Sequence, residues 1–239
     1  NKTGNNFRFD NLLKVMLKGL PSTDWVPPLL RYYEKFGYLE IMNFIKLLDN
    51  KFSTDWILQR TPTTRIENMN QIIKTIEKAI SVDDVLLDDA FDFDKGLFAE
   101  AIDEAVYGRR FTRYLLLKLD YLYHDDSQQM SLEALSVEHI LPQHPADNSQ
   151  WKIDFSDEER KEWTHRLGNL VLISTRKNTS LGRLDYAGDT GKKKKYFTQR
   201  INTSPNSLRV LQTYNQWTMD ELRNNHNEVL AKLKSHYGA

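Results

Sequence analysis

The sequence predicts a mainly α-helical fold, a helical bundle into which a short pair of β-strands is inserted before the last helices. Apolar residues recur at helical spacing through most of residues 9–124. Further along, only two short runs, residues 136–140 and 169–173, are typical of strands. With 239 residues, 40% hydrophobic and 28% charged, the composition is that of a globular chain long enough for one large domain or two small ones.

The N-terminal half divides into helices at recognisable start and stop signals. Two helices over residues 9–20 and 23–37 each have a glycine at their C-terminal end. A third begins at Tyr38, and we expect it to end or to be interrupted near Ser53. A fourth begins at Thr61, which precedes a proline as an N-cap residue often does.

The next helices follow the same logic. An apolar stripe over residues 66–80 predicts the buried face of the fourth helix. Ser81 precedes two acids and is expected to cap a further helix. A short helix over residues 98–105 is expected to end near Gly108. Residues 110–124 are too apolar for a surface helix, so this one is predicted to be central and buried.

A polar stretch, residues 125–129, is the most probable domain boundary. We therefore expect a helical domain over residues 1–129, a strand-containing core over residues 130–203 and C-terminal helices over residues 204–239 that pack on the rest. The two strands are separated by a long polar connection, and a connection of this length is commonly functional.

Charge is balanced overall but unevenly distributed. The chain has 33 basic and 33 acidic residues, yet residues 82–104 are strongly acidic and residues 160–200 strongly basic. The first stretch predicts a solvated acidic surface, and the second would attract polyanions. Arg109, Arg110 and Arg113, at the start of the helix over residues 110–124, are either a phosphate-contacting cluster or solvated residues at a helix end.

Several classes of protein are excluded by composition. The absence of cysteine excludes disulfides and thiolate zinc sites. Neither a long uncharged run nor an apolar N-terminal segment is present, so we expect a cytoplasmic protein with no membrane span or signal peptide. Residues 188–193 lack the spacing of a phosphate-binding loop, and no His-Glu-x-x-His helix exists. Because the chain begins at Asn1, we expect a processed chain or a fragment.

An acid and a histidine stand side by side at the end of the first strand run. Neighbouring side chains of a strand point to opposite faces, so Glu138 and His139 cannot both enter one dry core. Histidine titrates near neutral pH and suits a general base. Glu138 offers carboxylate oxygen atoms, which a hard divalent cation prefers.

The order of these residues resembles that of the HNH (ββα-metal, His-Me finger) endonucleases. More specifically, the chain resembles the nuclease domain of the GmrSD-type modification-dependent restriction systems and the related phosphorothioate-sensing defence effectors. In that family a helical region precedes the acid-histidine strand, and a helix that begins at a Trp follows the core. The matching segments are Glu138-His139-Ile140-Leu141-Pro142-Gln143, Gly168-Asn169-Leu170-Val171-Leu172-Ile173, Lys177-Asn178 and residues 192–196.

The resemblance implies a ββα-metal nuclease core within residues 130–203. It also implies a metal-dependent DNA endonuclease, nicking or cleaving, from a bacterial restriction or anti-phage defence protein, with DNA, including modified phage DNA, as its partner. The family's N-terminal nucleotide-hydrolysing domain has no counterpart here. We therefore expect the chain to be the C-terminal part of a larger protein.

The resemblance also implies site residues. His139, Asn169 and Asn178 are the catalytic residues: His139 is the general base, and Asn169 holds the long loop and orients His139. Glu138 and Asn178 are the ligands of one divalent cation, Mg²⁺ or Mn²⁺. DNA phosphates are bound by a basic set: Arg176, Lys177, Lys192, Lys193, Lys194 and Lys195.

Some residues leave alternatives open. Glu138 replaces the aspartate usual in the wider HNH class, and Asn178 stands where many relatives have a second histidine. His144 and His165 are either extra metal ligands or exposed histidines of a polar loop. The lysine run 192–195 is also typical of a solvated face. The alternative to an enzyme is a nucleic-acid-binding or regulatory module with a degenerate nuclease core.

Overall fold

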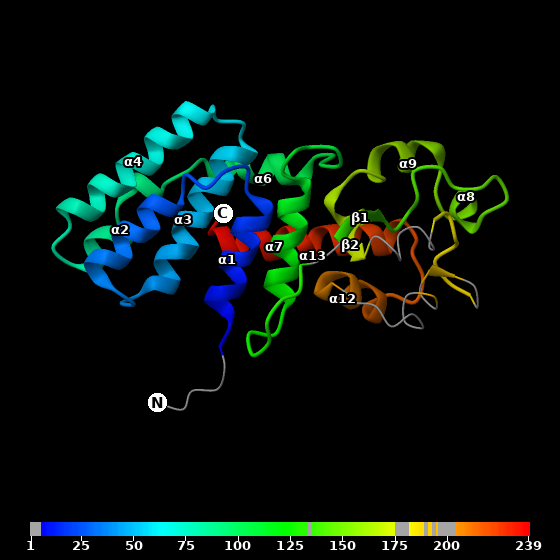
Figure 1. Ribbon diagram of the computed structural model, residues 1–239. Coiled ribbons are helices and arrows are strands. Elements are labelled where there is room, and N and C mark those ends of the chain that lie inside the picture. Colours follow the sequence, from blue (N-terminus) through cyan, green and yellow to red (C-terminus); the bar gives the residue numbers. More distant parts are fainter. Residues whose placement is uncertain (1–5, 133–134, 175–181, 189–190, 193–194, 196–203) are drawn as a thin grey trace.

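The computed structural model describes residues 6–132, 135–174, 182–188, 191–192, 195 and 204–239. Within them the fold is mainly α-helical with one two-stranded sheet, as predicted (Figure 1). The first helices are α1 (Arg8–Gly19), α2 (Val26–Phe36), α3 (Ile41–Ile57), α4 (Pro62–Lys78), α5 (Val82–Leu86), η1 (Asp89–Phe91), α6 (Lys95–Asp103) and α7 (Thr112–Tyr123). The rest are β1 (Leu135–His139), α8 (Gln150–Asp154), α9 (Asp157–Trp163), η2 (Leu167–Asn169), β2 (Leu170–Ser174), α12 (Pro205–Thr213) and α13 (Met219–Tyr237).

The expected ββα arrangement is described only in its strands. Between β2 and residue 204, where the rest of this core was expected, the structure describes only residues 182–188, 191–192 and 195. The two strands pair antiparallel, with His139 opposite Leu170.

Most helix boundaries agree with the sequence signals. Thr61 caps α4 by accepting a hydrogen bond from the Thr64 N–H, and Ser81 forms a reciprocal capping box with Asp84. Gly37 ends α2 with a φ of 61°, a conformation that glycine adopts without strain.

Three details differ from the expectations. Helix α3 runs through Ser53 without interruption, because the Ser53 hydroxyl is hydrogen-bonded to the Tyr237 hydroxyl (2.8 Å) and does not break the helix. Ile80 is 94% exposed, since α4 ends at Lys78 before the stripe does. Helix α6 ends at Asp103 rather than near Gly108.

The two-stranded sheet lies between two hydrophobic clusters. Leu170 and Leu172 of β2 belong to the larger cluster, which fills the helical half. Val171 and Ile173 belong to a smaller cluster built around Trp151 and Trp217. Both faces of the sheet are therefore covered, which explains why every residue of β2 is buried.

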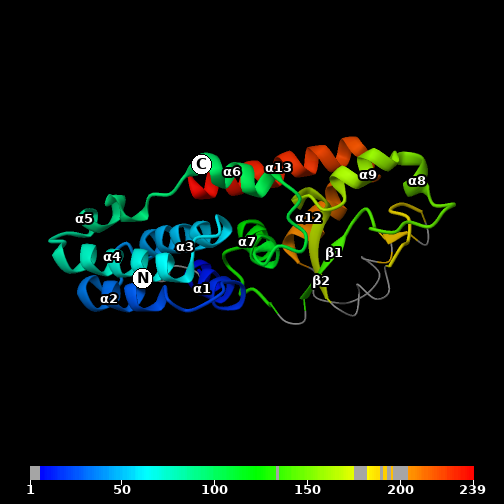
Figure 2. The ribbon, with the colours of Figure 1, turned by 90° about the horizontal axis from the view of Figure 1, so that it is seen from above.

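Two helices tie the strands to the helical half. Helix α7 is buried along most of its length, as predicted, and contacts both β2 and α12. Helix α13 extends past α6 and α7 and reaches η2, beside the strands (Figure 2). The larger hydrophobic cluster includes Leu170 and Val229, so it extends across the expected boundary at residues 125–129.

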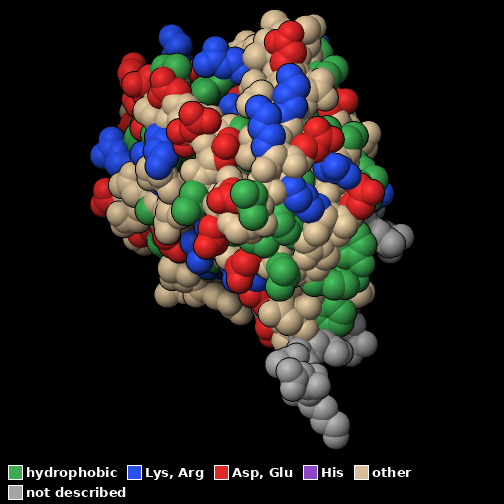
Figure 3. All heavy atoms as spheres, turned by 90° about the vertical axis from the view of Figure 1, so that its left-hand side faces the viewer, with side chains coloured by type: hydrophobic (Ala, Val, Ile, Leu, Met, Phe, Trp, Pro, Cys, Tyr) green, Lys and Arg blue, Asp and Glu red, His purple; other side chains and the backbone are tan. Residues whose placement is uncertain are grey.

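The acidic stretch lies on the surface. Most carboxylates of residues 82–104 are exposed, and several, such as Asp88 and Asp94, cap helix N-termini. Figure 3 shows the end of the molecule formed by the first helices, where acidic and basic side chains alternate over the surface. Among the described residues, no helix combines the length and apolar character that crossing a membrane requires.

Candidate functional site

Glu138 and His139 occupy opposite faces of the sheet at the end of β1. Glu138 pairs with Val171, on the side of the smaller cluster, and His139 pairs with Leu170, on the side of the larger one. Both side chains are buried. The strand thus brings an acid and a base to one place but separates their surroundings.

Asn169 holds the loop that follows the strand. The side-chain oxygen Oδ1 of Asn169 accepts a hydrogen bond from the Leu141 N–H (2.8 Å). The side-chain amide nitrogen donates to the Leu141 and Thr164 carbonyls (2.9 Å each). The side chain is fully buried, so these bonds are not shared with water. Leu141 is two residues from His139. That Asn169 orients the His139 imidazole through this contact stays a prediction.

Helix α13 supports the same segment from behind. The Gly168 N–H donates to His226 Nδ1 (3.1 Å), and the Asn225 amide donates to the Gly168 carbonyl (2.6 Å). His226 Nε2 in turn contacts Asp103 (2.7 Å). A Cβ at position 168 would lie 2.5 Å from the His226 backbone, so only glycine allows this approach.

A cluster of rings surrounds His139. Its Nε2 lies 3.3 Å from His165 Nδ1, and the Gln143 amide lies 3.4 Å from its Nδ1. The Tyr107 ring packs edge-on against His139, with centroids 4.2 Å apart, and stacks on His165 at 5.2 Å. Sequence reasoning left His165 undecided and missed Tyr107, which lies far upstream in the chain. The Val106 and Tyr107 N–H groups both donate to the His165 carbonyl.

The surroundings keep His139 uncharged. Burial lowers the pKa of His139 to about 3, with further lowering by His165 and by the positive charge of Lys192. Burial also lowers the pKa of His165. A neutral imidazole can accept a proton, as a general base must.

Glu138 forms a buried ion pair with Lys192. The Lys192 ammonium donates to Glu138 Oε1 (2.7 Å) and to the His139 carbonyl (2.8 Å). Burial raises the pKa of Glu138 and Lys192 opposes this, whereas burial lowers the pKa of Lys192 and Glu138 opposes that. The pair is stable as ions only because each partner compensates the desolvation of the other. Lys192 is thus buried rather than on a solvated face, and its predicted role in phosphate binding stays a prediction.

An open cavity of about 490 Å³ adjoins the acid-histidine pair. Gln143, the partner of His139 Nδ1, lines this cavity, and His165 does not. Nδ1 is therefore the ring nitrogen whose partner faces the cavity. The long Gln143 contact is weak and can be exchanged for water. The full lining is Glu138, His139, Pro142, Gln143, His144, Gly182 and Arg183.

The described donors do not by themselves make a cation site. Within the part of the chain that the structure describes, no group of three or more His, Asp or Glu side chains could hold a metal ion. Glu138 is already neutralised by Lys192, and a divalent cation would have to displace that ammonium. The second predicted ligand, Asn178, lies outside the described residues.

The other predicted phosphate-binding residues are mostly not described. Arg176, Lys177, Lys193 and Lys194 lie outside the described residues, and Lys195 is half-buried. Their role stays a prediction.

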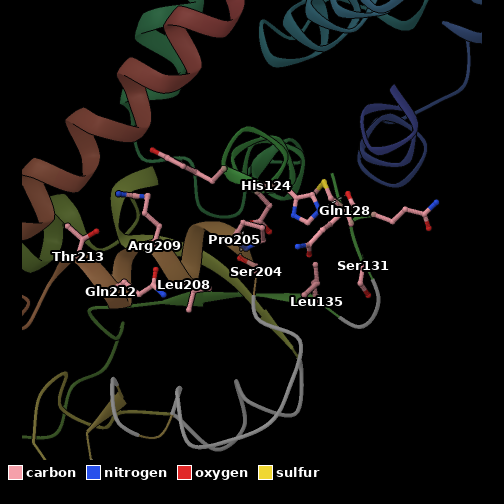
Figure 4. Close-up of a pocket in the computed structure, with 14 residues that line it drawn as sticks. His124, Gln128, Ser131, Leu135, Ser204, Pro205, Leu208, Arg209, Gln212 and Thr213 are labelled. Carbon is pink, nitrogen blue, oxygen red and sulfur yellow. Dashed lines mark hydrogen bonds between the residues drawn. The ribbon is translucent and has the colours of Figure 1, made fainter. Parts of the chain in front are cut away.

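A second cavity, of about 540 Å³, lies where the helical half meets the strands. Its walls come from the end of α7 (His124), the following turn (Gln128) and α12 (Leu208, Arg209) (Figure 4). Asp120 also lines this cavity, and one of its oxygens accepts hydrogen bonds from the Ser204 hydroxyl and the Asn206 N–H. Burial raises the pKa of Asp120 to about 7, and its other oxygen has no partner among the described residues.

Comparison with known proteins identifies a family. The family model described as GmrSD restriction endonucleases, C-terminal domain, matches residues 93–232, which is more than half of the chain. The matched region includes β1, β2, most of α13 and the histidine cluster, which consists of Tyr107, His139 and His165. Neither the curated proteins nor the solved structures gave a match.

Proposed function

This chain belongs to the family of the C-terminal domains of GmrSD restriction endonucleases, and we propose that it is an HNH-type, metal-dependent DNA endonuclease domain that nicks or cleaves DNA with His139 as the general base. The proposed setting is a bacterial restriction or anti-phage defence system, and modified phage DNA is the proposed substrate.

The observation that carries this proposal is a neutral histidine beside an open cavity. His139 sits at the end of β1, next to the cavity, and its pKa is lowered to about 3. Its imidazole is therefore neutral at neutral pH, with one ring nitrogen unprotonated, and that nitrogen can take a proton from a water molecule that attacks a phosphodiester. The low pKa also weakens the base. A DNA phosphate bound nearby would raise the pKa, so substrate itself would strengthen the base.

Mg²⁺ or Mn²⁺ is the proposed cofactor, and it would stabilise the charge that develops on the phosphate. Glu138 and Asn178 are its proposed ligands. To hold the cation, Glu138 would have to give up its ion pair with Lys192, whose ammonium would then be available to a substrate phosphate.

One observation favours the alternative, a nucleic-acid-binding or regulatory module with a degenerate nuclease core. The ion pair that engages Glu138 is buried on both sides, with side-chain exposures of 5% for Lys192 and 11% for Glu138. A permanent pair would leave no carboxylate for a cation and would make the site structural.

A cleavage assay separates the two functions. The chain is incubated with supercoiled plasmid DNA in Mg²⁺, in Mn²⁺ and in EDTA, and binding of the same DNA is measured in parallel. We expect nicked or linear plasmid with a divalent cation and intact plasmid in EDTA. Binding without cleavage under all three conditions would favour the binding module.

A further inference from the structure

A basic cavity lies in the helical half. This cavity, of about 470 Å³, opens between the start of α4 and the start of α7. Four arginines line it, and none of its lining residues is acidic. We call this cavity the arginine pocket, defined by Arg60, Arg65, Arg109 and Arg110.

Arg65 is the strongest sign that the arginine pocket binds a ligand. The residue is 8% exposed, and its Nη1 donates to the Arg60 carbonyl (2.8 Å). Its Nε is buried and has no hydrogen-bond partner among the described residues. An unsatisfied donor on a buried guanidinium is costly. Because Arg65 also lines the cavity, its guanidinium could turn towards an anion there, whose several acceptor oxygens would satisfy the donor.

The N-terminal end of α7 adds positive potential to the same pocket. Phe111 occupies the N-cap position, and it provides no capping side chain. Arg109 and Arg110 are exposed just before it. Arg113, the third arginine of this sequence cluster, instead donates to the Leu135 carbonyl (2.6 Å). Two of the three arginines are thus available to a ligand.

The arginine pocket is joined to the histidine cluster by one short segment. Tyr107 packs against His139 and His165, and Gly108 to Phe111 line the pocket. Consecutive residues advance by at most about 3.6 Å, so Arg109 lies within about 7 Å of Tyr107 along the chain. A DNA strand with one phosphate in the arginine pocket would therefore pass close to His139.

We propose that the arginine pocket binds a backbone phosphate of the DNA substrate on one side of the cleavage position. This proposal rests on the proposed function, since it assigns a substrate-positioning role to a surface outside the acid-histidine site. The pocket fits a phosphodiester because arginine presents paired donors that match phosphate oxygens. The contact reads no bases, so it contributes affinity and register rather than sequence preference.

The test measures binding of a short DNA duplex by fluorescence anisotropy over a range of salt concentrations, in the full chain with His139→Ala to prevent cleavage. Arg109→Ala/Arg110→Ala is compared with Lys74→Ala/Lys78→Ala, which removes two exposed charges from the other end of α4. We expect the arginine variant to weaken binding roughly tenfold. The slope of log K against log salt should fall by about one. The lysine variant should change neither.

The thermal unfolding of the parent chain and of the arginine variant is also measured with and without inorganic phosphate. Three results would overturn the proposal. They are equal effects of the two double variants on DNA binding, no binding of DNA at low salt, or an arginine variant that is no longer stabilised by phosphate but binds DNA as the parent chain does. The last result would assign the pocket to a free phosphate compound. Unchanged thermal unfolding of the arginine variant confirms that it is folded. If the parent chain, with His139 intact, binds DNA through these arginines but does not cut it, the proposed function is contradicted, whereas the assignment of the pocket to a DNA backbone phosphate stands.

Discussion

His139 owes its neutral state to its surroundings rather than to its residue type. The imidazole is buried, lies beside His165 and is close to the Lys192 ammonium, and all three lower its pKa. A free histidine titrates near pH 6.5, so the protein shifts this group far to the acid side.

The titration of His139 can be followed by NMR of the imidazole. We expect its resonances to stay constant from pH 8 to pH 5, and to show titration near pH 6.5 once the protein is unfolded in urea. Because the folded pKa is lowered, this group favours the folded state above pH 6.5. That contribution is lost as the pH falls towards 3. Protonation of His139 near pH 6 in the folded protein would contradict the described burial.

The Glu138–Lys192 pair can be tested by a double-mutant cycle. Glu138→Gln or Lys192→Met alone leaves one buried group without its partner, and each should lower the free energy of unfolding by about 3 to 5 kcal/mol. The combined variant should recover much of that loss. The measurement is urea unfolding of the three variants and the parent chain. Additive losses would show that the two side chains do not interact.

At this scale sequence order predicts some of the site. His139 stands out because it is a polar residue at the end of a strand run, and Asn169 was assigned through the family resemblance. Tyr107 and the Lys192 partner of Glu138 could not be found this way. Their contacts with the strand bridge long stretches of chain, and local spacing carries no information on such contacts.

Among the elements, η2 depends on its close approach to α13. A Cβ at Gly168 would lie 2.5 Å from the His226 Cα and Cβ atoms, so Gly168→Ala must displace either segment. We expect a loss of about 1 to 3 kcal/mol in the free energy of unfolding, because backbone cannot yield as a flexible side chain can.

Gly96→Ala is the matched control for this change. Gly96 lies in the first turn of α6, where a Cβ would meet only Asp94 Oδ1 at an ordinary 3.4 Å. This variant should be unchanged or more stable by up to about 1 kcal/mol, as expected for alanine in a helix. Denaturant unfolding of both variants checks the pair, and equal stabilities would mean that η2 and α13 are not in contact.

The positions of the helices were predicted better than the contacts between them. Helical periodicity and capping residues indicate α1, α2, α4 and α5 locally. In α3 the Ser53 hydroxyl contacts the Asn50 carbonyl and the Tyr237 hydroxyl, and no local signal indicates the second contact, which comes from the last helix.

Across the whole molecule, Asp120 reports on the junction between the helical half and the strands. Its pKa is raised to about 7 by burial, against hydrogen bonds from Ser204 and Asn206. The raised value means that a protonated Asp120 favours the folded state below about pH 4, and that this contribution is lost as the pH rises to about 7.

Asp120→Asn removes this pH dependence while keeping one acceptor oxygen. We therefore expect the variant to gain stability relative to the parent chain between pH 4 and pH 7, by at most about 1.4 kcal/mol per pH unit. The difference should be constant above pH 7. Thermal or urea unfolding over this pH range provides the measurement, and a difference independent of pH would show that Asp120 is ionised throughout.

The molecule as a whole combines a helical half with a small sheet that carries the acid and the histidine. The family match covers the second of these and the helices around it, from residue 93 to residue 232. Composition and charge could not reveal that the larger hydrophobic cluster joins both parts, because this depends on how α7 and α13 pack.

The central claim is that His139 is the general base of a nuclease, and single-turnover DNA cleavage tests it most directly. His139→Ala is compared with His144→Ala, a histidine that lines the same cavity. The proposal predicts a loss of roughly 10²-fold to 10⁴-fold for His139→Ala and little change for His144→Ala. Cleavage by His139→Ala at the rate of the parent chain would contradict the proposal.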